Sequence, residues 1–423
     1  MTPVNQPKDP RAKAALIARE SYGRLVAILA SRTSDIAAAE DVLADAFTKA
    51  MEKWPKEGIP QNPEGWLITV ATNRMKDIAK SGHSRTYGGS LEDVYMPLSD
   101  GSGLNNLSPD EIPDERLRLM FTCAHPALTS SIHTPLMMQT VLGFEVADIA
   151  SAYLMPSATL AQRLVRAKRK IKDAGIPFTL PEQADMTPRL TAVLEAVYGA
   201  YALNWDQQDL DRTKDMASEA TYLASVIADL LPEEPEALGL AALLAFSLAR
   251  RDARQDQTNG FIPLEMQDTS KWDRMLIRRG NVLLERAVNL GSPARFQLEA
   301  LIQSLHMSRA NTGQTDWLQI VQVYDALIQI APTTGAAIAR AAAVAKAHGF
   351  EAGLRALDTV HQLASKADLN HLQPYWATKA HLMRQKGDTP EARKGYEKAI
   401  SLTTDTSVRI WLEKEMETAA AKD

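Results

Sequence analysis

Residues 143–172 have the sequence GFEVADIASAYLMPSATLAQRLVRAKRKIK, which contains two helical patterns separated by a short turn. Val146, Ile149 and Ala150 give the first segment an apolar face, and Ser157 is expected to be the N-cap of the second. The second segment has an apolar stripe at helical spacing, formed by Leu160, Leu164, Ala167 and Ile171. A polar and basic stripe with the same spacing is formed by Thr159, Arg163, Arg166 and Lys170. This layout is typical of a helix-turn-helix.

The second segment is suited to the major groove of duplex DNA. Residues near its N-terminus would contact base edges: Ser157, Thr159, Gln162 and Arg163. Residues further along would hold phosphates: Arg166, Lys168, Arg169 and Lys170. A basic run by itself is usually the solvated face of an ordinary helix, but here the turn, the cap and the two stripes coincide. The sequence therefore predicts a DNA contact.

Residues 39–54, AEDVLADAFTKAMEKW, form a second amphipathic pattern. Its apolar face comprises Val42, Leu43, Ala46, Phe47, Ala50, Met51 and Trp54. Its opposite stripe comprises Asp41, Asp45, Thr48 and Glu52. Such a stripe could meet a basic helical partner, although most acidic stripes only face water.

Residues 62–85, NPEGWLITVATNRMKDIAKSGHSR, form a third helical pattern that starts at Asn62 and Pro63. Its apolar side carries Trp66, Leu67, Val70, Ala71 and Ile78. Its polar surface carries Thr69, Asn73, Arg74, Lys76, Asp77 and Lys80. Basic and amide groups near an aromatic ring suit single-stranded nucleic acid, although Trp66 taken singly is better explained as a core residue.

The composition is that of a globular, helical protein. The 423 residues are 45% apolar and 23% charged, with a net charge of −5. Residues 1–180 are nearly neutral, with 21 basic and 20 acidic residues, whereas residues 181–423 have 26 and 32. Cys123 is the one cysteine, which excludes an internal disulfide. The N-terminal residues have no pattern of an export signal peptide, so we expect a cytoplasmic protein. The longest apolar run, 237–249, is too short for a membrane span and predicts a buried helix.

The C-terminal half continues as helices with short breaks. Residues 377–402, ATKAHLMRQKGDTPEARKGYEKAISL, have the pattern of a tetratricopeptide unit. Its small residues, turn and aromatic are Ala380, Gly387, Ala392, Tyr396 and Ala399. A weaker copy spans 340–359, with Gly349 and Ala352 in the matching places. We expect an all-α fold that ends in a stack of helix pairs.

Catalytic and metal-binding patterns are absent from the sequence. Cys123, His125 and His133 lack the paired spacing of a zinc motif, so buried helix packing is the better explanation for them. No phosphate loop, nucleophile elbow or HExxH pair occurs. We therefore expect no cofactor, no metal and no catalytic residue.

The order of these segments resembles a sigma factor of the sigma-70 family, specifically the small extracytoplasmic-function group that has only domains 2 and 4. This resemblance covers residues 10–175. The rest of the chain resembles a subgroup of these sigma factors that has a tetratricopeptide-like C-terminal extension, so the resemblance then covers nearly the whole chain. DERLRLMFTCAHPAL (114–128), LVRAKRKIKDAGIPF (164–178) and DWLQIVQVYDAL (316–327) are similar to that subgroup. The implied domains are sigma domain 2 (10–81), a flexible linker (82–112), sigma domain 4 (113–175) and the extension (186–423).

The resemblance implies partners and roles for the segments. Core RNA polymerase would be bound through its β′ clamp helices and β flap, with Asp41, Asp45 and Glu52 at the clamp helices. The −10 promoter element would be opened and held by Trp66, Asn73, Arg74, Lys76 and Lys80. The −35 element would be recognised by Ser157, Thr159, Gln162, Arg163, Arg166 and Lys170. The linker's acidic residues, which would suit the RNA exit path, are Glu92, Asp93, Asp100, Asp110 and Glu111. The few basic residues after Arg85 depart from many family members.

Two alternatives remain open at the level of sequence. A helix-turn-helix regulator would bind duplex DNA without polymerase and would leave the acidic stripe unexplained. A tetratricopeptide scaffold would bind peptides and would not need the basic residues of 163–172. In the sigma interpretation the acidic extension regulates or supports activity, for instance by masking the basic stripe, and a regulatory protein could bind it; no membrane partner is expected.

Overall fold

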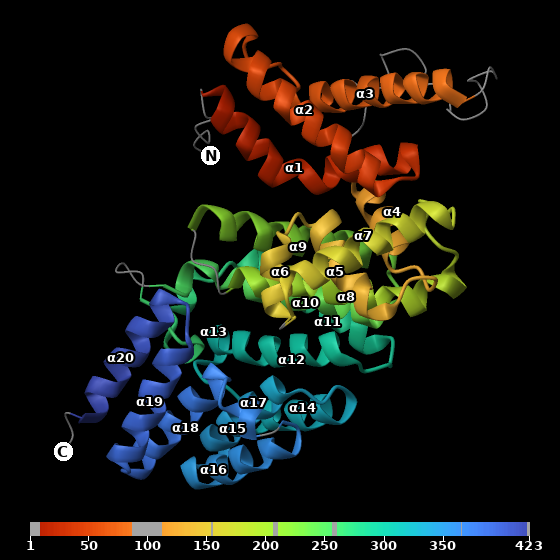
Figure 1. Ribbon diagram of the computed structural model, residues 1–423. Helices are drawn as coiled ribbons and strands as arrows, with labels where there is room; N and C mark the ends of the chain where they lie inside the picture. Colours follow the sequence, from red (N-terminus) through yellow and green to blue (C-terminus); the bar gives the residue numbers. More distant parts are fainter. Residues whose placement is uncertain are drawn as a thin grey trace. The chain divides into compact units, whose positions relative to one another are not determined.

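The structure is a computed structural model that describes residues 9–86, 112–153, 155–205, 210–255, 260–364 and 366–420 (Figure 1). Within these ranges nearly all residues are helical, and the one β feature is an isolated bridge between Gln255 and Phe261. The predicted all-α fold is confirmed. The chain divides into two units, residues 1–200 and 201–423, and the division falls inside helix α8 (Gln183–Trp205).

Three helices open the first unit: α1 (Pro10–Thr33), α2 (Ile36–Glu57) and α3 (Pro63–Thr86). Short polar side chains start them, because each can satisfy a backbone N–H that has no partner within the helix. Asp35 accepts from the Ala38 N–H at 3.1 Å at the start of α2, and Asn62 accepts from the Gly65 N–H at 2.9 Å at the start of α3. The three helices pack around buried residues that include Leu25, Leu29, Leu43, Trp54 and Leu67.

The next helices of this unit are α4 (Ile112–Cys123), α5 (Ser130–Thr140), α6 (Val146–Ala152) and α7 (Ser157–Asp173). The predicted apolar stripe of α7 is confirmed, since Leu160, Leu164, Ala167 and Ile171 are all buried. The prediction that Ser157 is the N-cap is wrong. Pro156 occupies the cap position in an extended conformation, no side chain caps the helix, and Ser157 is the first helical residue.

Helix α1 approaches the segment after α5 very closely. A Cβ added to Gly23 would lie 1.7 Å from the Val141 carbonyl oxygen, so only glycine permits this distance between the two backbones. The N-terminal helices and the α4–α7 group therefore share one packed body within the first unit, with α4 also packed on α1.

The second unit contains helices α9 (Leu210–Leu230), α10 (Pro235–Ala249), α11 (Arg274–Asn289), α12 (Arg295–Met307), α13 (Arg309–Thr312), α14 (Trp317–Ile330), α15 (Thr334–His348), α16 (Phe350–Asp358), α17 (Lys366–Leu369), α18 (Gln373–Lys386), α19 (Thr389–Leu402) and α20 (Thr406–Ala420). Short 3₁₀ turns lie at Arg251–Ala253, Leu264–Met266, Thr269–Lys271 and Thr359–Gln362. As predicted, the apolar run 237–249 is a buried helix, and α11 and α12 pack on it. Within the described part of the chain, no helix combines the length and hydropathy needed to cross a membrane.

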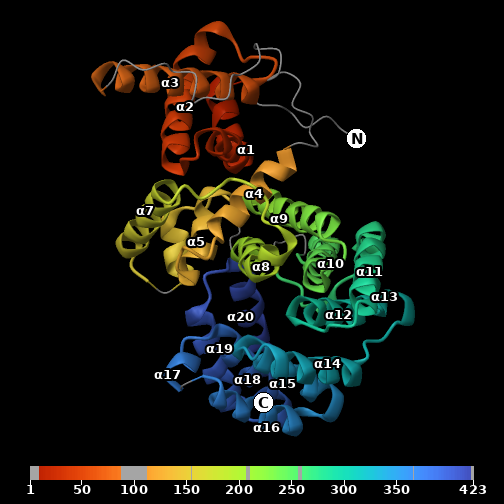
Figure 2. The ribbon, with the colours of Figure 1, turned by 90° about the vertical axis from the view of Figure 1, so that its right-hand side faces the viewer.

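The C-terminal helices pack in sequence, α14 on α15, α15 on α16, and α18 on α19 (Figure 2). Gly387 ends α18 in the left-handed region at φ 85°, which lets the chain reverse into α19. A Cβ on Gly395 would lie 2.9 Å from the Ala380 Cβ, so small residues set the spacing of this pair. Ala380, Ala392, Tyr396 and Ala399 are all fully buried in its core.

Candidate nucleic-acid interface

The outer face of α7 carries most of the residues predicted to contact DNA. Ser157, Thr159, Gln162, Arg166 and Lys170 are exposed. Arg163 is half-buried, and its guanidinium donates a hydrogen bond of 2.6 Å to the Ser131 hydroxyl of α5. Arg166 and Lys170 form no ion pair within the described part of the chain. The helix therefore combines an anchored apolar side with an outer side on which hydrogen-bonding and cationic groups are available.

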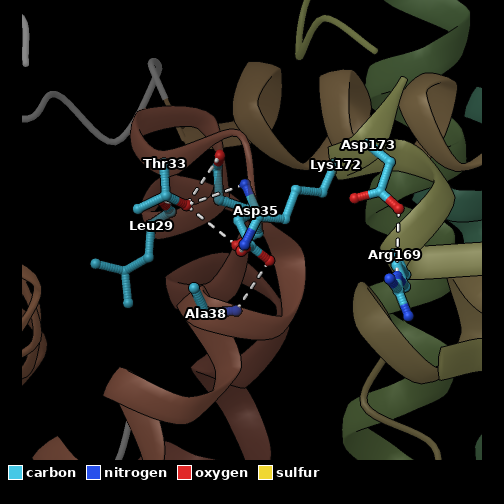
Figure 3. A network of polar contacts seen from close by, with 8 residues as sticks. Leu29, Thr33, Asp35, Ala38, Arg169, Lys172 and Asp173 are labelled. Atoms are coloured by element: carbon cyan, nitrogen blue, oxygen red, sulfur yellow. Dashed lines mark hydrogen bonds and ion pairs between the residues drawn. The ribbon is translucent and has the colours of Figure 1, made fainter. Parts of the chain in front are cut away.

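The inner face of α7 carries two lysines that pair with α2. Lys168 is buried, and its Nζ lies 2.6 Å from both carboxylate oxygens of Glu40. Lys172 Nζ lies 2.7 Å from Asp35 Oδ2, and this hydrogen bond and charge raise the pKa of the Lys172 ammonium (Figure 3). The prediction that Lys168 holds a phosphate is therefore wrong in this conformation. Sequence reasoning also missed Glu40 and Asp35, since no local pattern connects them with residues about 130 positions later.

The predicted acidic stripe lies on the surface of α2, where Asp41, Asp45 and Glu52 are all exposed. Asp45 also meets a residue predicted for the −10 contact, because its carboxylate lies 3.0 Å from Arg74 Nε. Both side chains are about half exposed, at 51% and 46%, so the pair is screened and contributes little to stability. Met51, predicted for the apolar face, is exposed instead at the edge of this stripe.

The residues predicted to hold the −10 element lie along α3. Asn73, Arg74 and Lys76 are exposed, whereas Trp66 is half-buried and packs edge-on against Trp54 with ring centroids 5.5 Å apart. Trp66 thus belongs partly to the core. The placement of Ile78 on the apolar side is wrong, because its side chain is 49% exposed. A further set of residues lies outside the described part of the structure: the Lys80 side chain and the linker residues Glu92, Asp93, Asp100, Asp110 and Glu111.

Both ends of the predicted linker 82–112 are helical in the structure, because α3 continues to Thr86 and α4 begins at Ile112. Helix α3, which carries the residues predicted for the −10 element, therefore ends later than expected from the sequence.

Cys123, His125 and His133 have local structural roles. Burial raises the pKa of the Cys123 thiol to about 12. His133 Nε2 lies 3.2 Å from the Leu128 carbonyl, and His125 Nδ1 accepts the Ala127 N–H at 3.1 Å. Burial lowers the pKa of both imidazoles. Among the described residues, no three His, Cys, Asp or Glu side chains gather as they would around a metal ion.

Comparison with known proteins finds a family match in two segments of the chain. Residues 17–85 match the family Sigma-70 region 2, and residues 189–288 match a family of unknown function, DUF6596. An uncharacterized protein of Rhizobium meliloti is 32% identical over 391 residues, which cover 91% of this chain and 90% of that protein. The probable RNA polymerase sigma factor RfaY of Xanthomonas campestris pv. campestris is 25% identical over 169 residues, 38% of this chain and 42% of that protein. No solved structure matches. The region 2 match and the similarity to a sigma factor, on a helical chain with this N-terminal architecture, show that the protein is a member of the sigma-70 family of RNA polymerase sigma factors.

Proposed function

We propose that the outer face of α7 recognises the −35 element of a promoter. The observation that carries this proposal is the division of α7 into a buried apolar stripe and an exposed polar and basic stripe. In a major groove, the first turns of such a helix contact base edges through Ser157, Thr159 and Gln162. Arg166 and Lys170, further along, are placed for phosphates. On binding DNA, the Arg163 guanidinium would give up its hydrogen bond to the Ser131 hydroxyl and would donate hydrogen bonds to the edge of a guanine instead.

The helices α2 and α3 would supply the other two contacts of a sigma factor. Membership of the family implies core RNA polymerase and promoter DNA as partners, in a role that involves no catalysis. We assign core binding to the exposed stripe of Asp41, Asp45 and Glu52, since rim charges favour encounter and register with a basic helical partner. The −10 strand would be held by Asn73, Arg74, Lys76 and Lys80, with Trp66 at the edge of the core. Capture of unpaired bases would shift the equilibrium toward open DNA by differential affinity.

The chain would be organised as sigma domain 2 (10–81), a linker (82–112), sigma domain 4 (113–175) and a tetratricopeptide-like extension (186–423). Support for the extension comes from its consecutively packed helices and from the small-residue contact between α18 and α19. Its acidic composition fits a regulatory or supporting role rather than a DNA contact. A truncation that tests this role should end after α8, because residue 186 lies inside that helix.

The −35 assignment is tested by binding of the complex with core polymerase to a library of promoter duplexes. Arg163→Ala should change the preferred sequence, whereas Arg166→Ala should weaken binding uniformly, because a phosphate contact carries no sequence information. Arg393→Ala is the matched control, since Arg393 is exposed and its ion pair is with Glu397 on its own helix. If all three substitutions had the same effect on promoter binding, the proposed role of α7 would be wrong. Promoter binding that does not depend on core polymerase would favour the alternative of a helix-turn-helix regulator.

A further inference from the structure

Helix α11 carries a basic surface within the acidic C-terminal part of the chain. Residues 181–423 contain 26 basic and 32 acidic residues, yet α11 has four arginines, no lysine and one glutamate. The arginines are Arg274, Arg278, Arg279 and Arg286, and all four side chains are exposed. None of them forms an ion pair within the described part of the chain. A helix that concentrates cations in this way favours the approach of an acidic partner.

The same side of α11 exposes two large apolar side chains. Met275 is 68% exposed and Val282 is 52% exposed. They lie seven residues apart, nearly two full turns, and therefore on one line along the helix. The other side of α11 is covered, because Leu283, Leu284 and Ala287 are buried and the helix packs on α10 (Figure 2). The two exposed apolar residues thus take no part in the core of this unit.

Arginines flank this apolar line on both sides. At about 100° per residue, Arg278 lies on one side of the line, and Arg279 and Arg286 lie on the other. An apolar centre with a charged rim is the anatomy of a protein–protein interface, where methionine and arginine are enriched and lysine is depleted. We call these five residues the α11 surface: Met275, Arg278, Arg279, Val282 and Arg286.

The composition of the α11 surface favours a protein partner over a nucleic acid. Its aliphatic centre makes no favourable contact with phosphates, and the exposed Glu285 next to Arg278 would repel them. A partner helix with apolar residues at the same spacing would cover Met275 and Val282, and its carboxylates would pair with the arginines. The family implies core RNA polymerase and promoter DNA as partners, and of these polymerase is the one that presents helices.

We propose that the α11 surface is a second docking site for core RNA polymerase and binds an acidic, amphipathic helix of that enzyme. The inference rests on the proposed function as a sigma factor, but not on the roles assigned to α3 and α7. The α11 surface is basic and the stripe of α2 is acidic, so the two contacts require different surfaces of polymerase. Two contacts on one chain raise the overall affinity, because the second forms at a high effective concentration once the first is made.

The test is the affinity of the full chain for purified core polymerase, measured by biolayer interferometry with immobilised polymerase. The charge variant combines Arg278→Glu with Arg279→Glu. The matched control combines Arg393→Glu with Lys394→Glu on α19. Each double substitution reverses two adjacent, exposed cations of one helix, so both change the net charge of the chain by the same amount.

The charge variant should bind polymerase about tenfold more weakly or worse, with slower association because the electrostatic attraction is reversed. An apolar variant, Met275→Gln with Val282→Gln, should weaken binding about three- to tenfold, mainly through faster dissociation. The α19 control should stay within about twofold of the wild type, because charges beyond a Debye length from the contact are screened. All variants should keep the helix content of the wild type, since every substituted side chain is exposed.

A charge variant that binds polymerase as tightly as the α19 control would overturn the inference. An apolar variant with wild-type affinity for polymerase would overturn it too; if the charge variant also loses affinity for a promoter duplex without polymerase, the α11 surface binds DNA instead. Light scattering that shows a dimer for the free wild type and a monomer for the charge variant would make a second copy of this chain the occupant.

Failure of the proposed function has a different signature. Wild-type protein would then not bind core polymerase at all, and both the sigma function and the α11 contact would be wrong. If the wild type binds and only the α11 inference fails, Asp41→Lys with Asp45→Lys should still weaken binding while the charge variant of α11 does not.

Discussion

The salt dependence of DNA binding gives a quantitative test of which cations of α7 reach the phosphates. Six basic residues lie between 163 and 172. In the structure, Lys168 and Lys172 are paired with α2 and Arg163 is bound to Ser131, which leaves Arg166, Arg169 and Lys170 exposed on the outer side. Arg169 pairs with Asp173 within the helix, but at 81% and 61% exposure that pair is weak enough for a phosphate to displace it.

Each phosphate contact contributes about −0.9 to the slope of log Kobs against log salt concentration. Three contacts therefore predict a slope of about −2.7 for a duplex that carries only the −35 element. Six contacts would give about −5.4, and Arg166→Ala should reduce the magnitude by about 0.9. Between 50 and 200 mM salt, one contact corresponds to about a 3.5-fold change in affinity.

The assay is fluorescence anisotropy of a labelled duplex titrated with the full chain at four or five salt concentrations. Lys168→Gln should leave the slope unchanged, because Lys168 faces α2 rather than the groove. A slope near −5 for the wild type, or a slope that Lys168→Gln reduces as much as Arg166→Ala does, would refute the division of α7 into two faces.

Three further predictions concern stability. Burial, with the nearby Arg250 and Arg309, lowers the pKa of His306 to about 4 from an ordinary 6.5, so the contribution of the neutral imidazole to stability is fully present above pH 6.5 and is lost as the pH falls toward 4. The free energy of unfolding at pH 5 should therefore be about 1–2 kcal/mol below that at pH 7, and His306→Gln should remove this difference. Gly23→Ala should destabilise the first unit by about 1–3 kcal/mol in thermal or denaturant unfolding, since the added Cβ would lie 1.7 Å from the carbonyl of Val141. Tyr396→Phe should raise the free energy of unfolding by about 1 kcal/mol, because the buried hydroxyl has no hydrogen-bond partner within the described part of the chain.

Two of these predictions have a matched control. His371→Gln changes an exposed histidine and should leave the pH dependence of unfolding as it is. Gly335→Ala adds a Cβ where no heavy atom lies within 4 Å and should not destabilise the fold. The account of His306 would be contradicted by a wild type that is equally stable at pH 5 and pH 7. The account of Gly23 would be contradicted by a Gly23→Ala protein as stable as Gly335→Ala. The account of Tyr396 would be contradicted by a Tyr396→Phe protein that loses stability.

Periodicity predicted the parts of the fold that depend on one segment at a time. The stripe of Leu160, Leu164, Ala167 and Ile171 is buried as predicted, because an apolar face at helical spacing has to be covered by something. The start of α3 at Pro63 and the buried helix at 237–249 were predictable for the same local reasons.

The errors arise where tertiary contacts decide. Lys168 has the residue type of a phosphate contact, but its position on the helix faces α2, and nothing near it in the sequence reveals Glu40. Met51 and Ile78 fit apolar faces by spacing, yet both side chains are exposed in the structure. Ser157 has the residue type of an N-cap, but Pro156 takes the cap position with its extended backbone. Residue type and spacing therefore identified the candidate surfaces, and the contacts between helices determined which cations remain available for DNA.

The central claim, that this protein directs polymerase to promoters, is tested most directly by run-off transcription with purified core RNA polymerase on a library of promoter sequences. The account predicts start sites that appear only when the protein is added, with shared −35 and −10 sequences upstream, and a loss of these transcripts for Arg163→Ala. Transcripts that are identical with and without the protein, together with no binding of the protein to core polymerase, would contradict the account.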